Sequence, residues 1–311
     1  MSLKTQVIVN PESDLGRTKK RWKQIKEALP SFLKEFKYDF TEKPLQATEM
    51  TREALKEGNE LIVGVGGDGT MNEIANGFYE NRKMVNPEAA LGIVPSGSGC
   101  DFRKSLKIPL GLKNSLKVIS EGPSIRIDIG RVTFRSLTGK EEQRFFLNVA
   151  DFGFGGEVAK TFNQRRMRRK SSSYLRCMLS TITKYKNKRL KIKTDREEIP
   201  EDEYLVGAVA NGKIFGKGMK IAPQACLDDG LFDFVLVKGM RLLEFFLNCW
   251  KVYTGTHLSH PKISVMRSQK IKAIPHRNEN DILIELDGEL PGKLPATFEI
   301  VPKVLQVKGY V

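Results

Sequence analysis

The chain has 311 residues, with 52 Lys and Arg residues against 37 Asp and Glu residues, which gives a formal charge of +15. This length exceeds the usual size of a single hydrophobic core and indicates two domains. The positive charge favours an acidic partner: a nucleic acid, an anionic membrane surface or a phosphorylated substrate. Charge alone does not choose among them.

Three sequence features limit the compartment. The four cysteines, at positions 100, 177, 226 and 249, show no Cys-x-x-Cys spacing, so we expect a reducing compartment and no zinc site. Residues 1–5 lack the apolar stretch of a secretion signal, so export is not expected. The apolar stretch 242–250 contains Glu244 and Asn248 and is shorter than the roughly 20 residues that span a bilayer. It is expected to touch a membrane without crossing it.

Residues 1–122 alternate between strand and helix patterns. The expected strands are 6–9, 38–40, 61–65 and 91–94, and the expected helices are 18–36, 48–56 and 71–78. This alternation predicts a Rossmann-like parallel α/β domain with helices on both faces of the sheet. Ligands of such sheets bind beyond the carboxyl ends of the strands. We therefore expect one cleft at the polar residues that follow these strands: Asn10, Thr41, Asp68 and Ser96.

A glycine-rich turn, Gly66-Gly67-Asp68-Gly69-Thr70, links the strand 61–65 to the helix 71–78. Glycines let the backbone approach a ligand closely, and the N–H groups that open a helix attract an anion. Asp68 would repel a bare pyrophosphate but attract a phosphate through Mg²⁺, so it favours a metal-bound nucleoside triphosphate. The alternative is a tight turn that binds nothing. Residues 64–69 also match the dinucleotide fingerprint, but the next strand ends in Pro95-Ser96 without an acid.

A second glycine loop, residues 95–102, follows the strand 91–94 in the same way. Two such loops on parallel strands predict a paired phosphate clamp, with the hydroxyls of Ser96 and Ser98 donating to phosphate oxygens. Asp101 could hold a metal-bound water, although capping the short helix that follows is the simpler interpretation.

Beyond residue 122 the pattern changes to short strands, which predict an antiparallel β-sandwich or curved sheet. The expected strands are 125–134, 144–149, 190–193, 204–210, 231–237, 271–274 and 282–286. Helices are expected at 172–184 and 240–253. The closing segments 297–301 and 304–307 either complete this sheet or return to the first domain.

A series of motifs runs through nearly the whole chain in order. They are Gly66–Thr70 with Asn72-Glu73, Pro95–Phe102, Leu106–Pro109, Asp128–Gly130, Phe152–Gly155, Gly216–Met219 with Ala222-Pro223, Asp228–Asp233 and Asp287–Glu289. This series resembles the diacylglycerol kinase catalytic-domain family, which includes bacterial lipid kinases and sphingosine kinases. The first motif is shared with NAD kinases and phosphofructokinases.

The resemblance implies a two-domain enzyme that binds ATP in the cleft between its domains and transfers the γ-phosphoryl group to a lipid hydroxyl. The domains would be 1–122, which binds nucleotide, and 123–302, which binds lipid, with 303–311 a candidate to return to the first. Asp287 would be the general base with Glu289 beside it, because a positioned carboxylate suffices for phosphoryl transfer. Without the resemblance, Asp287-Gly288-Glu289 is more typical of a type I′ hairpin turn with solvated acids.

The loops and the resemblance together give the remaining site residues. Asp68 would also act in catalysis. The expected nucleotide contacts are Asn10, Thr41, Gly66, Gly67, Asp68, Gly69, Thr70, Glu73, Ser96, Gly97 and Ser98. The expected Mg²⁺ ligands, direct or through water, are Asp68, Asp101 and Asp128, and a structural Mg²⁺ is expected at Asp228 and Asp229.

Two positions depart from the family pattern. Cys100 stands where the family has Asn, so a thiol that hydrogen-bonds weakly replaces an amide, which affects nucleotide choice or affinity. After Asn10-Pro11 the family's glycine is displaced to Gly16, so that loop is expected to sit differently over the phosphates.

The stretch 165–193 contains twelve Lys or Arg residues and no acid. We expect it to rest on anionic lipid, with four nearby side chains available for shallow insertion: Tyr174, Leu175, Met178 and Leu179. The alternative is a solvated cationic face. His257 and His260 lack a third ligand and are expected to be structural or solvent-facing.

The sequence thus predicts a cytoplasmic lipid kinase, dependent on ATP and Mg²⁺ and peripherally associated with the inner face of a membrane. Its acceptor would be diacylglycerol or a related lipid, with no nucleic-acid partner and a homodimer left open. Two alternatives remain: a small-molecule kinase similar to NAD kinases, and a basic nucleotide-binding module that is not an enzyme.

Overall fold

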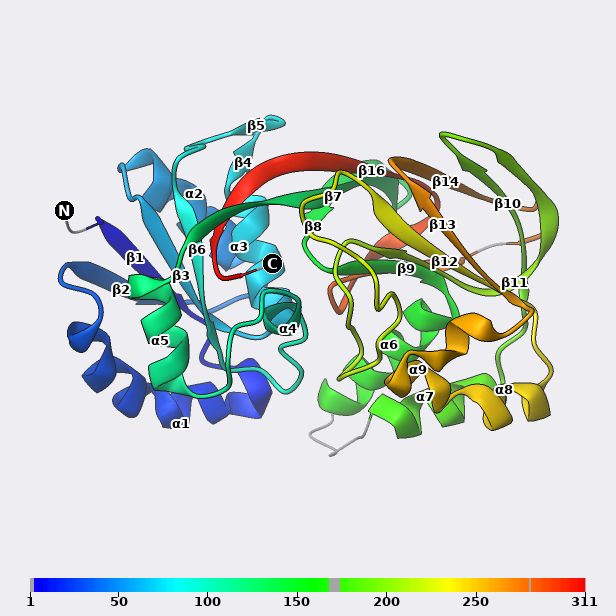
Figure 1. The fold of residues 1–311 in the computed structure, drawn as a ribbon, viewed down its shortest axis with the longest axis horizontal. Coiled ribbons are helices and arrows are strands. Elements are labelled where there is room, and N and C mark those ends of the chain that lie inside the picture. The colour runs from blue at the N-terminus through cyan, green and yellow to red at the C-terminus, as the bar shows by residue number, and fades with distance from the viewer. Residues whose placement is uncertain (1–2, 168–173, 280, 311) are drawn as a thin grey trace. The chain divides into compact units, whose positions relative to one another are not determined.

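The computed structural model describes residues 3–167, 174–279 and 281–310 (Figure 1). The chain divides into two compact units, residues 1–129 with 302–311, and residues 130–301. The first is a mixed α/β unit and the second is rich in β-strands. The prediction of an N-terminal α/β part followed by a β-rich part is therefore confirmed.

The sheet of the first unit is parallel. Its strand order is β2 (Phe36–Phe40), β1 (Thr5–Val9), β3 (Leu61–Gly66), β6 (Ala90–Pro95). The last part of β16 (Glu289–Lys308) adds a further parallel strand beside β6, where Gln306 pairs with Ala90. All residues of β1 and β3 are buried, because these strands lie inside the sheet under helices.

Helices cover both faces of this sheet. They are α1 (Ser13–Ala28), α2 (Gln46–Lys56), α3 (Asp68–Gly77), α4 (Phe102–Ser105) and α5 (Leu112–Glu121). Ile25 of α1 and Leu116 of α5 share one core with Val63. On the other face, α3 packs so closely that a Cβ atom on Gly64 would lie 2.6 Å from side-chain atoms of Met71 and Ile74.

The helix predicted at 18–36 is too long. It ends at Ala28, and Leu29–Ser31 form a single 3₁₀ turn, η1, because Pro30 has no N–H to continue an α-helix. The backbone at Asp14, Leu15 and Gly16 is left-handed, so the regular helix begins after Gly16. The short hairpin of β4 (Tyr79–Glu80) and β5 (Lys83–Met84) was not predicted.

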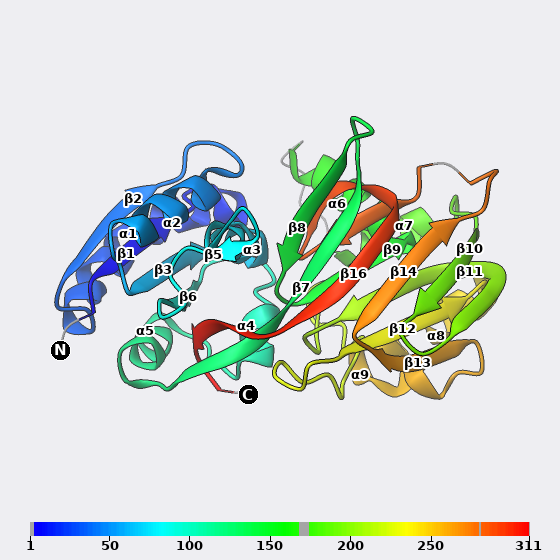
Figure 2. The same cartoon turned by 90° about the horizontal axis from the view of Figure 1, so that it is seen from above.

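In the second unit six antiparallel strands lie side by side (Figure 2). Their order is β13 (Ile263–Ser268), β12 (Phe232–Lys238), β11 (Glu198–Ala210), β10 (Lys188–Thr194), β14 (Lys270–Pro275), β16. Strand β9 (Val149–Gly153) pairs with β11 and β15 (Leu283–Leu286), and β7 (Ser124–Ser136) pairs with β8 (Glu141–Phe146). Buried aromatic rings fill the core, and those of Phe146 and Phe232 stack at 5.6 Å.

Helices line one edge of this unit (Figure 1). They are α6 (Phe154–Met167), α7 (Tyr174–Ile182), α8 (Leu242–Asn248) and α9 (Lys251–Thr254), followed by the 3₁₀ turn η2 (Thr256–Ser259). Among the described residues, no helix is both long and apolar enough to cross a bilayer.

The prediction of a single helix at 240–253 is wrong, because two shorter helices, α8 and α9, occupy this stretch. The interruption falls at Cys249 and Trp250, and the indole Nε1 of Trp250 donates to the Leu247 carbonyl at 3.0 Å there. The helix predicted at 172–184 contains α7, and residues 172–173 lie outside the described residues.

Helix α6 was not predicted, because two of its first residues are glycines, which have low helix propensity. A Cβ atom on Gly155 would lie 2.1 Å from the Asp151 carboxylate, and one on Gly156 would lie 2.9 Å from Leu283, so close packing requires both glycines. Strand β13 was also missed. The strand predicted at 144–149 is two strands, β8 and β9, and the two predicted closing segments form the single strand β16.

Candidate active site

The two glycine loops of the first unit lie against each other at the carboxyl ends of β3 and β6. The backbone N–H of Ser96 donates to the Gly66 carbonyl at 2.8 Å. A Cβ atom on Gly97 would lie 2.5 Å from the Cα atom of Gly67, so the loops approach backbone to backbone. Only glycine at position 97 permits this contact.

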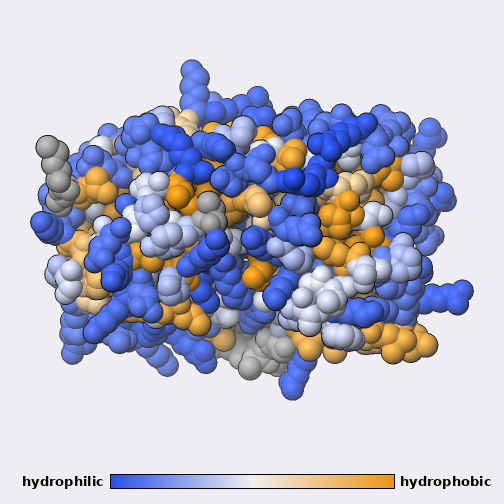
Figure 3. All heavy atoms as spheres, viewed as in Figure 1, coloured by the Kyte–Doolittle hydropathy of each residue, from blue (hydrophilic) through white to orange (hydrophobic). Residues whose placement is uncertain are grey.

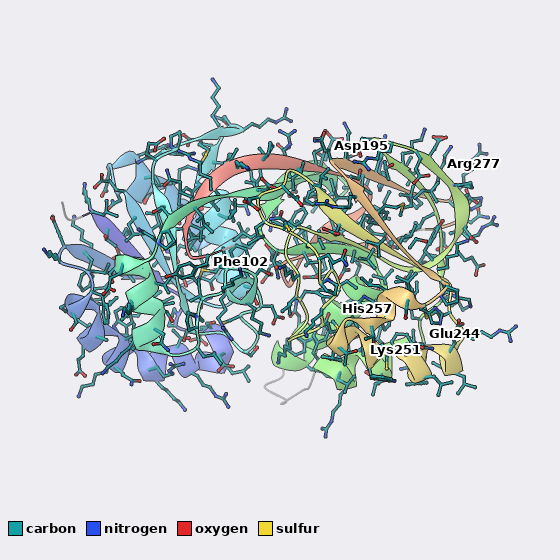
Figure 4. All side chains as sticks on the ribbon, viewed as in Figure 1. Phe102, Asp195, Glu244, Lys251, His257 and Arg277 are labelled. Carbon is teal, nitrogen blue, oxygen red and sulfur yellow. The ribbon has the colours of Figure 1, made fainter. Side chains whose placement is uncertain are left out.

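Asp68 joins the two loops. Its carboxylate accepts the backbone N–H of Asp101 at 3.0 Å and that of Phe102 at 3.1 Å. These N–H groups open α4, so Asp68 satisfies two donors that the helix leaves unpaired. Phe102, the first residue of α4, is labelled in Figure 4. The prediction that Asp101 caps the helix is wrong: its carboxylate is buried and forms an ion pair with Lys104 at 2.6 Å.

Two side-chain pairs hold the loops to their neighbours. The amide Nδ2 of Asn10 donates to the Thr70 hydroxyl at 3.0 Å. The Ser96 hydroxyl is buried and bonds to the Thr18 hydroxyl at 2.7 Å, so it holds α1 to the loop. The Ser98 side chain is exposed and faces solvent. Of the two predicted phosphate donors, the Ser98 hydroxyl is therefore the accessible one.

Three other predicted residues make contacts that support the fold. Thr41 follows β2, is buried and donates its backbone N–H to the Val9 carbonyl at 2.9 Å. A carboxylate oxygen of Glu73 accepts the Ala47 N–H at 3.3 Å and so caps the first turn of α2. The buried Asp128 carboxylate accepts the Lys303 N–H at 2.7 Å, which joins β7 to β16 within the first unit.

Cys100 lies in the second loop with a left-handed backbone, at φ 49°. Its sulfur accepts the backbone N–H of Gly97 at 3.1 Å. Burial, together with the nearby Asp68 carboxylate, raises the pKa of the thiol to about 12. Cys100 is therefore a neutral packing group at physiological pH, and it stabilises the turn by accepting the Gly97 N–H.

The described residues contain no cluster of three or more His, Cys, Asp or Glu side chains placed to hold a metal. Mg²⁺ usually binds one or two carboxylates and completes its shell with water and phosphate, so such a cluster is not required. Asp68 fits this role by its chemistry, because it places a carboxylate where the two glycine loops meet. The pair at Asp228 and Asp229 fits poorly, since Asp229 already accepts the Leu231 N–H at 3.0 Å and is ion-paired with Arg267.

Asp287 and Gly288 form the turn between β15 and β16 in the second unit. Both have positive φ values, 48° and 96°, as a type I′ turn requires. The Asp287 side chain is not solvated, however. It is buried, and its carboxylate accepts three backbone N–H groups: those of Leu147 at 2.7 Å, Asn148 at 3.0 Å and Val149 at 3.1 Å. Glu289 is exposed at the start of β16.

A second pair of acids lies in the strands next to this turn, and the sequence analysis did not predict it. Asp151 of β9 and Glu285 of β15 stand directly opposite each other in register, and both are buried. The two carboxylates interact with each other, and that of Asp151 also lies against the backbone N–H of Gly156. A carboxylate oxygen of Glu285 accepts the Gly288 N–H. An acid inside each of two apolar strand patterns was the available signal.

Burial raises the pKa of Asp151 to about 6 and raises that of Glu285 well above its usual value. The repulsion between the two carboxylates adds to the shift of Glu285. Because two ionised carboxylates this close repel, the pair is stable when it shares a proton. It thereby supports the turn that carries Asp287.

This pair predicts a pH-dependent stability. Its pKa values are raised on folding, so its stabilising contribution is complete below about pH 4 and falls as pH rises through about 6. Glu285→Gln keeps an acceptor for Gly288 and supplies a donor to Asp151, so we expect it to raise the melting temperature at pH 8 by several degrees but not at pH 5. Melting curves of this variant and of the exposed control Glu142→Gln test this. A lower melting temperature at pH 8 would contradict it.

The second unit also contains an apolar cavity of about 110 Å³. It lies among α6, α7, α8 and α9, and its lining includes Phe154, Met178, Phe245 and Val252. Other lining residues are half-buried, so the cavity reaches the surface. His257 also lines it, and its ring nitrogen Nε2 bonds to the Ile221 carbonyl at 3.1 Å. Burial lowers the pKa of His257, as expected for a structural histidine.

Comparison with known proteins identifies the family. Residues 4–132 match the model of the diacylglycerol kinase catalytic domain, and residues 148–309 match that of the YegS C-terminal NAD kinase beta sandwich-like domain. A diacylglycerol kinase of Staphylococcus aureus is 30% identical over 305 residues, which cover 96% of this chain and 90% of that protein. The chain belongs to the diacylglycerol kinase family.

Members of this family are lipid kinases, so the chain belongs to a family of phosphotransferases. A diacylglycerol kinase of Staphylococcus carnosus is 27% identical over 303 residues, covering 96% of this chain and 92% of that protein. A crystal structure of a diacylglycerol kinase from Bacillus anthracis has the same fold, with a TM-score of 0.71, 22% identity and coverage of 98% of this chain and 96% of that one.

Proposed function

We propose that this member of the diacylglycerol kinase family transfers the γ-phosphoryl group of ATP to the hydroxyl of diacylglycerol or a closely related lipid, in the presence of Mg²⁺. The observation that carries the proposal is the pair of glycine loops bridged by Asp68. It combines glycine-rich loop backbone for phosphate with a carboxylate for a metal, in a chain whose relatives are named diacylglycerol kinases.

In this proposal the first unit binds the nucleotide. The backbone of residues 66–70 and 97–98 and the Ser98 hydroxyl contact the phosphates, while Asn10 positions Thr70. Asp68 would hold the metal, and Asp101, whose N–H bonds to Asp68, would contribute through a metal-bound water. When bound, Mg²⁺ would neutralise charge on the phosphate oxygens. Thr41, Glu73 and Ser96 act by positioning the elements around the site, because each already supports the fold.

Asp287 is proposed as the base that accepts the proton of the lipid hydroxyl, with Glu289 close to it in sequence. The three N–H groups that Asp287 accepts favour its ionised form and fix its orientation. A base in phosphoryl transfer must be positioned more than it must be strong. A buried carboxylate held at three points meets that requirement.

The apolar cavity among α6, α7, α8 and α9 supports a lipid as acceptor. A cavity of about 110 Å³ lined by aromatic and aliphatic side chains favours a hydrocarbon chain over a polar metabolite. We also propose the finer parts of the predicted fold: the first unit is Rossmann-like, and the second is a β-sandwich. An anionic membrane surface is the proposed partner.

Transfer of label from γ-labelled ATP tests the proposal. The protein is incubated with Mg²⁺, labelled ATP and dioleoylglycerol in mixed micelles, and the products are partitioned between water and an organic solvent. We expect label in the organic phase, in phosphatidic acid. Label in an aqueous product only, with NAD as acceptor, would indicate a kinase similar to NAD kinases, and label in neither phase would indicate a binding module.

A further inference from the structure

Helix α8 presents a row of large apolar side chains to solvent. We call this row, which extends to Trp250 just beyond the helix, the α8 apolar face. Its members with their exposed fractions are Leu242 (45%), Leu243 (71%), Phe246 (39%), Leu247 (63%) and Trp250 (56%). Figure 3 shows apolar side chains gathered over α8 at the end of the second unit. Single exposed leucines are ordinary, but five such residues within nine positions form a patch that marks an interaction site.

The other side of α8 is packed. The Phe245 ring is buried and contacts the Phe154 ring edge to face at 5.5 Å. Phe245 and Cys249 also line the apolar cavity. The helix therefore has an inner side that encloses the cavity and an outer side, the α8 apolar face, that nothing in the described chain covers.

The charge around the face is positive. Glu244 is the one acid between residues 242 and 260, and it is paired with Lys262 at 2.7 Å and lies 3.6 Å from His260. Arg241 is exposed and Lys251 half-buried at the two ends of the face. Figure 4 shows Glu244 and Lys251 along this edge. The neighbouring α7 adds an exposed arginine, Arg176, and an exposed leucine.

We propose that the α8 apolar face inserts shallowly into an anionic lipid bilayer, while the flanking basic side chains contact lipid phosphates. The proposal builds on the proposed lipid kinase function, since it names the surface from which a lipid would reach the cavity. Apolar side chains bordered by cations are the pattern of an interfacial helix. A second copy of the chain fits less well, because a symmetric contact would bring Arg241 and Lys251 of both copies together.

Vesicle binding tests this proposal. The double variant Leu243→Ser/Leu247→Ser changes two of the most exposed residues of the face, and Leu110→Ser/Leu137→Ser is the matched control, with leucines 72% and 63% exposed elsewhere. We expect the first to bind phosphatidylcholine–phosphatidylglycerol vesicles at least about tenfold more weakly, since each inserted leucine contributes substantially to partition. The control should bind as the unaltered protein does, and added salt should weaken binding in all three.

Trp250 supplies a direct readout, because the chain has two tryptophans and the other, Trp22, lies in α1. We expect Trp250 emission to shift to shorter wavelength on anionic vesicles and to be quenched by brominated lipid, and Trp250→Phe to lose both signals. Equal vesicle binding by the unaltered protein and the α8 variant would overturn the proposal. So would an unquenched Trp250, or a dimer that the α8 variant dissociates without loss of vesicle binding.

Activity with two acceptors separates this proposal from the proposed function. If both hold, the α8 variant phosphorylates dispersed dioctanoylglycerol normally but loses activity on long-chain diacylglycerol in vesicles. If the unaltered protein phosphorylates neither acceptor while the α8 variant still loses vesicle binding, the kinase proposal fails and the membrane surface stands. If the variant phosphorylates both acceptors as well as the unaltered protein does, the proposed membrane surface is refuted and the kinase proposal stands.

Discussion

Replacing Asp287 by asparagine is expected to lower turnover by at least about 100-fold, because the amide cannot accept the proton of the acceptor hydroxyl and general bases contribute about 10²–10⁴-fold. The KM for ATP should change little, since the proposed nucleotide contacts lie in the first unit. The substitution also brings an NH₂ group toward N–H donors that now meet a carboxylate. We therefore expect the free energy of unfolding to fall by about 1–3 kcal/mol as well.

A matched control separates the two effects of this substitution. Asp195, labelled in Figure 4, also accepts backbone N–H groups, those of Gln269 at 3.1 Å and Lys270 at 3.4 Å, in the same unit. Asp195→Asn should lower the melting temperature without lowering turnover. Turnover of both variants is measured at a temperature where each is fully folded. Near-normal turnover of Asp287→Asn under these conditions would refute its role as base.

Replacing Asp68 by alanine is expected to lower kcat/KM for ATP by about 100-fold or more. Two hydrogen bonds to a charged acceptor are lost, each contributing about 1.5–3 kcal/mol, and without them the second loop is no longer held to the first. Glu60 gives the control, since its carboxylate accepts the Lys4 N–H at 3.2 Å just before the start of β3. Glu60→Gln should leave kcat/KM unchanged.

Calorimetry distinguishes the two roles proposed for Asp68. ADP is titrated into the unaltered protein and into Asp68→Asn, with and without Mg²⁺. If Asp68 holds the metal, Mg²⁺ strengthens nucleotide binding in the unaltered protein and much less in the variant. An equal effect of Mg²⁺ on both proteins would show that Asp68 only joins the loops. A crystal soaked with ADP and Mg²⁺ that shows no nucleotide at these loops would remove the basis of the site assignment.

Patterns of short range predicted most of the first unit. Strands β1, β3 and β6 lie where apolar runs end in glycine or polar residues, because a buried parallel strand is mostly apolar. The pattern failed where one residue changes the outcome. Pro30 ended a helix that apolar periodicity alone would extend.

Glycine-rich sequences could not be interpreted locally. Gly155 and Gly156 argue against a helix by their intrinsic propensity, yet they begin α6, because Asp151 and Leu283 leave no space for a Cβ atom. Glu285 likewise interrupts the apolar pattern of β15, and the reason is the facing Asp151, with which it forms a buried pair. Leu283 is far from Gly156 in sequence, and Glu285 is far from Asp151, so no local pattern contains the information about these contacts.

The sequence by itself determined the family, the two glycine loops and the kind of chemistry, because these depend on residue types at fixed short spacings. Tertiary structure alone decided what each carboxylate does: Asp68 joins the loops, Asp287 is held by three backbone donors, and Asp151 with Glu285 forms a buried pair. The reason is physical. A carboxylate has the same composition everywhere, and its charge, orientation and proton depend on the donors and the burial that folding brings to it.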